Sequence, residues 1–121
     1  MHAFILQDWV TIRGGATQVT QSQQDWLDLS PYQDVVLWLD VREQTGSPTI
    51  TFQTAPAADE SLFQALGGAS TLVASSSPVV LSGLMSALAT PLARYLRWQL
   101  NGSGSWDAMF RVFVTANAPG I

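Results

Sequence analysis

The stretch from Asp34 to Arg42 constrains the fold of this chain more than any other. Its apolar residues occupy alternate positions, at Val35, Leu37, Leu39 and Val41. Because successive side chains of a β-strand point to opposite faces, this spacing predicts a strand with one unbroken apolar face. The β-branched residues and the tryptophan in the stretch also prefer strands to helices. We therefore expect a central β-strand here, with the other apolar runs beside it or facing it.

Two pairs of alternating segments predict antiparallel hairpins. The central strand is followed by the turn formers of 45–48 and then by an alternating run over 49–54. The second pair consists of 93–100 and 108–116, with a loop of Asn, Gly and Ser at 101–105 between them. Alternating runs joined by a short turn rich in Gly, Pro, Asn or Ser are typical of hairpins. Each pair is therefore expected to lie side by side in one sheet.

Shorter runs complete an all-β pattern. Strands are expected over 3–12, 26–30, 71–74 and 78–81, whereas 16–24 is strand or loop, 61–66 is a helical turn or short strand, and 82–91 stays undecided. About seven or eight short strands, with turn signals roughly every 8 to 12 residues, predict a single antiparallel β-sandwich or jelly roll. A chain of 121 residues is expected to form one domain over 1–121.

Charged residues are scarce, and their balance limits the possible partners. They make up 12% of the chain, and five arginines, with no lysine, oppose nine acids to give a net charge of -4. Nucleic-acid binding needs clustered positive charge, so we expect no nucleic-acid partner. Low charge favours association with copies of the chain or with a larger assembly. The absence of lysine has two explanations. It reflects either genomic composition bias or the avoidance of lysine on surfaces that are buried in an assembly, where arginine is better suited.

Signals for export, membranes and disulfides are absent from the sequence. The apolar run at 3–6 is too short for a signal peptide and lacks a basic flank, so synthesis and folding in the bacterial cytoplasm are expected. No run approaches the roughly 18 apolar residues that span a bilayer, and no membrane partner is expected. The chain has no cysteine, so it has neither disulfides nor thiolate metal sites.

Patterns for catalysis and cofactors are weak. His2 is the single histidine and lies beside Met1, without the partner that a catalytic base needs. The Gly pairs match no phosphate-binding loop, and we expect neither an enzyme nor a cofactor. Asp59 and Glu60 share a loop, where they are either calcium ligands or solvated acids that protect strand edges. A hydrolase with paired acids is the weakest of the functions considered.

Tryptophan is in excess, with five in the chain. Trp98 alternates with apolar neighbours and is expected in the core. Trp106 follows the Gly/Ser loop, and two placements are open for it. It is either an exposed ring that stacks on a sugar or anchors an interface, or a ring packed over the end of the sandwich with its N–H bonded to the backbone.

Arginine and aromatic residues gather on the last two predicted strands. If these strands pair, one outward band of interface-like composition forms from Tyr95, Arg97, Arg111 and Phe113. The alternative is a solvated face whose arginines pair across strands with Asp40 or Glu43. The predicted interface residues are Phe4, Trp9, Tyr95, Arg97, Trp106, Arg111 and Phe113.

Several segments together resemble small β-sandwich proteins encoded among the structural genes of tailed phages and prophages. The matching segments are 26–30, 32–41, 49–56, 93–98 and 110–114. In that family a QTSP-like loop and an RYVR-like strand recur, and residues 53–56 (QTAP) and 94–97 (RYLR) hold those places here. The usual Asp-Gly after the proline is replaced by residues 57–59 (AAD). The resemblance implies a capsid decoration or minor structural protein of a virion, without catalytic residues.

Two functions follow from these observations. The first is a non-enzymatic structural protein of a phage or phage-like particle. It would bind a shell or tail-like assembly through apolar and Arg/aromatic surfaces, as an oligomer, and would be located in the particle. The second is a carbohydrate-binding module or receptor-binding domain that uses loop tryptophans to hold a glycan.

Overall fold

The computed structural model describes residues 2–15, 18–32, 34–66, 71–72, 79–83, 92–102 and 104–117. Its strands are β1 (His2–Gly14), β2 (Val19–Thr20), β3 (Leu27–Asp28), β4 (Asp34–Thr45), β5 (Thr49–Ala55), β6 (Gln64–Ala65), β7 (Thr71–Leu72), β8 (Val79–Gly83), β9 (Tyr95–Asn101) and β10 (Trp106–Asn117). Two short 3-10 turns, η1 (Gln23–Asp25) and η2 (Glu60–Leu62), complete the described elements. The predicted all-β sandwich is confirmed.

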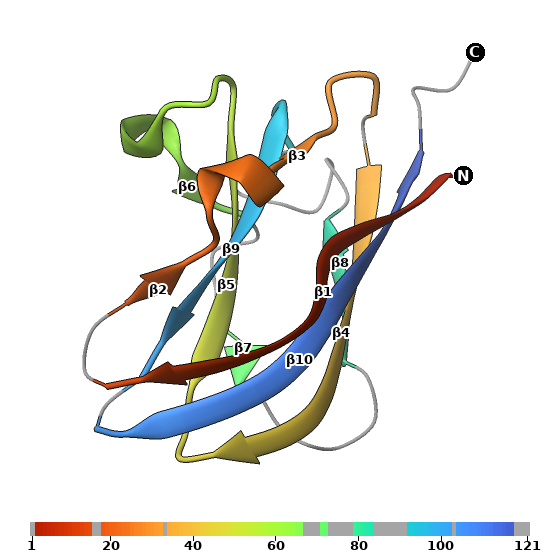
Figure 1. Cartoon of the computed structure of the whole chain (residues 1–121). Helices are drawn as coiled ribbons and strands as arrows, with labels where there is room; N and C mark the ends of the chain where they lie inside the picture. Colours follow the sequence, from red (N-terminus) through yellow and green to blue (C-terminus); the bar gives the residue numbers. More distant parts are fainter. Residues whose placement is uncertain are drawn as a thin grey trace.

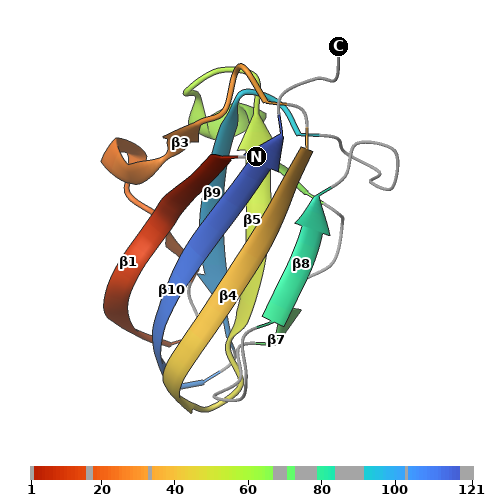
Figure 2. The same cartoon turned by 90° about the vertical axis from the view of Figure 1, so that its right-hand side faces the viewer.

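The strands form two antiparallel sheets that pack face to face (Figure 1). The sheet that we call the front sheet has the order β1-β10-β4-β8, and Figure 2 shows it from its outer side. The back sheet has the order β2-β9-β5-β6, with β3 also paired to β9 and β7 to β5. The strands β2, β3, β6 and β7 have only two residues each, so most of the back sheet consists of β5 and β9.

Strict alternation of side chains builds the core. Along β10 every second residue is buried, from Trp106 through Phe110 to Ala116, and the residues between them are half-exposed. The predicted central strand is β4, and its four alternating apolar residues are all buried. Trp98 of β9 is 3% exposed and meets the Phe110 ring edge-on at 5.3 Å, which confirms it as a core residue.

Both predicted hairpins are wrong, because each turn carries the chain from one sheet to the other. β4 pairs with β10 and β8 in the front sheet, whereas β5 pairs with β9 in the back sheet. The turn between β9 and β10 also crosses between the sheets. Alternation shows only that each strand has one buried face. Two strands meet this condition whether they lie side by side in one sheet or face each other across the core.

Trp106 fills the end of the sandwich where these two crossing turns meet. The ring is 2% exposed, and its Nε1 donates to the Gly15 carbonyl at 2.9 Å. A Cβ on Gly14 would lie 2.2 Å from ring atom Cζ2, and one on Gly102 would lie 2.4 Å from Cδ1. Gly46, in the other turn, has φ +73° and lies against the Trp106 backbone. The exposed placement of Trp106 is therefore wrong, and the packed placement with a backbone hydrogen bond is confirmed.

A break in the β1–β10 pairing ties the two sheets together. The register shifts twice between Ile5 and Val10, which frees the Leu6 carbonyl. That carbonyl accepts a hydrogen bond from Nε2 of Gln21 at 2.6 Å, and the Gln21 side chain also accepts from the backbone N–H of Trp98 at 3.3 Å. Gln21 is 3% exposed, so this amide joins β1 to β9 inside the protein.

The remaining expected segments fall partly within the described residues. The segment 16–24 contains β2 and part of η1, the segment 26–30 contains β3, and 61–66 contains part of η2 and all of β6. Of the strands expected over 71–74 and 78–81, the structure describes 71–72 in β7 and 79–81 in β8. Residues 84–91, most of the undecided segment, lie outside the described residues.

Candidate functional site

The outer face of the front sheet carries aromatic side chains that the core does not use. Phe113 of β10 lies between Trp38 of β4 and Ile5 of β1 in the strand register. The exposed fractions are 39% for Trp38 and 55% for Ile5. We call this surface the outer aromatic face and define it by Ile5, Trp9, Trp38, Arg42, Arg111 and Phe113. Contiguous exposed apolar side chains of this kind mark interaction sites on folded proteins.

Arg111 lies between two rings at the middle of the outer aromatic face. Its guanidinium lies 4.6 Å from the centre of the Trp9 ring and 4.7 Å from that of Phe113. Its Nε donates to Oδ2 of Asp40 on the neighbouring strand at 2.9 Å. Arg42 lies over the same Trp9 ring at 5.1 Å. The cross-strand pairing with Asp40 that we considered for these arginines is thus confirmed for Arg111.

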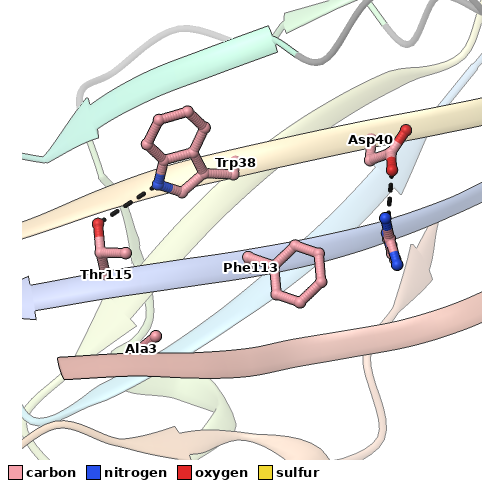
Figure 3. A pocket seen from close by; sticks show the side chains of 6 residues that line it. Ala3, Trp38, Asp40, Phe113 and Thr115 are labelled. Carbon is pink, nitrogen blue, oxygen red and sulfur yellow. Dashed lines mark hydrogen bonds and ion pairs between the residues drawn. The ribbon is translucent and has the colours of Figure 1, made fainter.

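A hollow of about 310 Å³ opens beside this arginine. Its lining residues are Ala3, Trp38, Asp40, Arg111, Phe113 and Thr115 (Figure 3). The indole Nε1 of Trp38 donates to the Thr115 hydroxyl at 3.3 Å, and Asp40 accepts from Arg111. The polar groups around the hollow therefore already bond to one another, and aromatic rings and methyl groups supply most of its surface.

Only three of the seven predicted interface residues, Trp9, Arg111 and Phe113, meet on the outer aromatic face. Phe4 packs against the core and meets the Tyr32 ring at 5.4 Å, and Trp106 is buried. Tyr95 and Arg97 belong to β9 in the back sheet. The predicted joint band is therefore wrong, because β9 and β10 lie in different sheets. Sequence reasoning missed Ile5, Trp38 and Arg42 as members of the site.

Arg97 lies in a separate cluster over the outer side of the back sheet. It is 3% exposed, and its guanidinium lies 3.9 Å from the centre of the Phe63 ring and 5.1 Å from that of Trp26. Its Nη1 pairs with Glu60, and its Nε donates to Gln53 at 2.8 Å. We call these five residues the Arg97 box. Since its arginine is covered by the chain itself, the box holds the loop after β5 against the sheet.

The two loop acids considered as calcium ligands have protein partners. Glu60 pairs with Arg97, and Asp59 accepts hydrogen bonds from the backbone N–H and the hydroxyl of Ser61. These bonds lower the pKa of Asp59, with the hydroxyl bond as the larger cause. In the described parts of the chain, no three His, Asp or Glu side chains cluster as metal ligands would. The same residues include no helix long and apolar enough to cross a membrane.

Arg94, just before β9, forms an exposed ion pair with Asp28 of β3, and this pair makes the stability of the fold depend on pH. Arg94 donates to both carboxylate oxygens of Asp28, and the Ser30 N–H donates to Oδ1. These bonds hold the pKa of Asp28 below its ordinary value, with Arg94 as the larger cause. Such a carboxyl stabilises the fold above its unfolded pKa, and this contribution is lost as the pH falls through the folded pKa.

Replacing Arg94 with glutamine is therefore expected to raise the pKa of Asp28 toward the ordinary range and to remove most of this contribution. An NMR titration of the side-chain carboxyl carbons measures the change. The carboxyl of Asp59, which owes its lowered pKa to Ser61, serves as the control and should not move. An unchanged pKa for Asp28 would show that Ser30, rather than Arg94, holds it low.

The comparisons with known proteins concern the fold. No protein-family model and no curated protein sequence matches the chain. One similar solved structure is of Bacillus endospore appendages, described as disulfide-linked pili, with 18% identity and a TM-score of 0.48 over 98% of this chain and 93% of that one. Another is of the Gx strain of infectious bursal disease virus, with 12% identity and a TM-score of 0.50 over 98% of this chain.

This chain spans 32% of the viral chain, about a third of its length. At 12% identity, the likeness to the viral chain shows a shared fold alone.

Proposed function

We propose that this chain is a non-enzymatic structural protein of a phage or phage-like particle, which buries its outer aromatic face against another protein of the assembly. The observation that carries the proposal is the exposure of Trp38 and Ile5 on either side of Phe113. Aromatic residues and arginine are enriched in protein interfaces, and a few such side chains dominate the binding energy. The front sheet presents them on three adjacent paired strands, β1, β10 and β4, which suits a docking surface.

The particle assignment is supported by the resemblance to phage structural proteins and by the low charge. A surface with few repelling charges packs readily against copies of the chain or against a shell. The fold shared with a chain of infectious bursal disease virus fits this assignment. We place the protein in the particle as an oligomer or as a partner of a shell or tail-like protein.

The alternative, a module that binds carbohydrate through loop tryptophans, has less support. The ring chosen for it, Trp106, is buried at the end of the sandwich. The exposed indole, that of Trp38, lies in the middle of β4 beside a hollow whose polar groups bond to one another. A sugar site needs free donors and acceptors beside its aromatic platform.

The double variant Trp38→Ala/Phe113→Ala is expected to reduce incorporation into the particle by at least about tenfold. Two interface residues of this kind contribute on the order of 2 kcal/mol or more to binding, and 1.4 kcal/mol corresponds to a factor of ten. Quantitative mass spectrometry of purified particles measures the change. Leu62→Ala is the matched control, because Leu62 is 41% exposed but lies on η2, away from the front sheet.

Incorporation that is unchanged in the double variant, or reduced equally by Leu62→Ala, would contradict the proposal. Both variants must first show the circular dichroism spectrum of the wild type. Binding of the purified chain to a glycan array, abolished by Trp38→Ala, would favour the carbohydrate alternative instead.

A further inference from the structure

We infer that the protein partner of the outer aromatic face presents both a carboxylate and an apolar side chain. The carboxylate pairs with Arg42, and the apolar side chain enters the hollow between Trp38 and Phe113. This inference rests on the proposed function, since it names the chemistry of the partner that this surface binds.

The first observation is the unequal pairing of the arginines. Four of the five form ion pairs with carboxylates, namely Arg13 with Asp107, Arg94 with Asp28, Arg97 with Glu60 and Arg111 with Asp40. Arg42 is exposed, and no described side chain forms an ion pair with it. Within the described part of a chain with nine acids and a net charge of -4, Arg42 is thus a cation without an ion-pair partner at the edge of an aromatic surface.

The second observation is the way in which Arg42 is held. Its guanidinium lies over the Trp9 ring at 5.1 Å, on the same ring that Arg111 contacts at 4.6 Å. Stacking on a ring occupies the face of a guanidinium and leaves its N–H groups free at the edge, where a carboxylate bonds to two of them at once. Asp40 pairs with Arg111 alone among the described side chains, so the N–H edge of Arg42 is left to attract a carboxylate of the partner.

The third observation is the chemistry of the hollow. The Trp38 indole bonds to Thr115 and Nε of Arg111 bonds to Asp40, and among the described residues no buried polar side-chain atom lacks a partner. The rings of Trp38 and Phe113 remain as the walls. An aliphatic or aromatic side chain fills such a space without leaving a polar group unbonded.

The test is a selection from a displayed library of short random peptides on the intact, immobilised chain. Peptides that also bind the Trp38→Ala variant are removed, so that the remaining peptides use the hollow. We expect the enriched peptides to combine Asp or Glu with Phe, Leu, Met or Trp within a few residues of one another. For a synthesised peptide from this set, Arg42→Glu is expected to raise the Kd at least about tenfold, and Arg42→Lys is expected to raise it less.

Arg13→Glu is the matched control. It makes the same charge change on an exposed arginine of the same sheet, whose side chain is 82% exposed and which lies beyond the aromatic residues, opposite Asp107. It should leave the Kd within about twofold, since distant exposed charges are screened. Equal losses from Arg13→Glu and Arg42→Glu would overturn the inference, because the effect would then be one of net charge.

The outcomes separate the inference from the proposed function. Peptides that are lost on Trp38→Ala but show no acidic preference and no effect of Arg42→Glu would leave the docking surface standing and overturn its assigned partner chemistry. Self-association of the wild type that Trp38→Ala abolishes and Arg42→Glu leaves intact would do the same, with a second copy as the occupant. Glycan binding that requires Trp38, without any selected peptide, would overturn both.

Discussion

Replacing Trp106 with alanine is expected to lower the free energy of unfolding by about 3–5 kcal/mol, the range for removal of a large buried aromatic side chain. The ring is 2% exposed and fills the end of the sandwich. Gly14 and Gly102 approach it so closely that neither position has room for a Cβ. Both close contacts are made by backbone, of β1 and of the turn before β10. The surrounding chain is therefore expected to fill only part of the cavity that the alanine leaves. The Gly15 carbonyl also loses its indole donor.

Chemical denaturation, followed by circular dichroism, measures this change. Trp106→Phe keeps an aromatic ring without the N–H and is expected to lie between the wild type and the alanine variant. Trp38→Ala removes the same residue type from a site that is 39% exposed, and its effect is expected to be about 1 kcal/mol or less. If Trp106→Ala is no more destabilising than Trp38→Ala, the ring does not hold the end of the sandwich together.

The parts of the fold that follow from side-chain alternation were predictable. The alternating apolar residues of β4 and β10 predicted which face of each strand is buried, and every one of these residues in β4 is buried in the structure. Such a pattern depends only on the two-residue period of a strand. For the same reason, the class of fold followed from the number and spacing of the apolar runs.

The pairing of the strands was not predictable from the same pattern. Alternation determines which face is buried but says nothing about whether the next strand lies beside it or across the core. The residues of the two turns, with Gly46 and Gly104 at positive φ, suit a turn between sheets as well as a hairpin. The contacts that decide between them come from β1 and β8, which are distant in sequence from both turns.

The candidate site was predictable in part for a related reason. Trp38 and Arg42 alternate with the buried residues of β4, so the two-residue period of a strand agrees with their place on the outer face of the front sheet. The irregularity in β1, which brings Trp9 to the same surface, has no signal in the local sequence. Arg97 was expected to point outward, and its side chain lies on the outer side of β9, away from the core. It is buried because Trp26 and Phe63, from two distant loops, cover it.

Replacing Arg97 with alanine is expected to lower the free energy of unfolding by about 3 kcal/mol. Breaking a buried ion pair typically destabilises a protein by about 3–5 kcal/mol. The lower end applies here because the Glu60 side chain is 69% exposed and regains water when its partner is removed. The alanine also leaves a space against the Trp26 and Phe63 rings, both of which contact the guanidinium. Arg97→Met, which refills much of that space without the charge, is expected to be less destabilising.

Denaturation measures the loss of stability, and tryptophan fluorescence reports whether Trp26 becomes exposed. Arg13→Ala is the matched control, because Arg13 also pairs with an acid, at 3.8 Å, but its side chain is 82% exposed. Exposed pairs contribute little, so this variant should leave stability nearly unchanged. Equal effects of Arg97→Ala and Arg13→Ala would mean that burial under two rings adds nothing to the pair. The loop after β5 would then rest on the sheet without stabilising it.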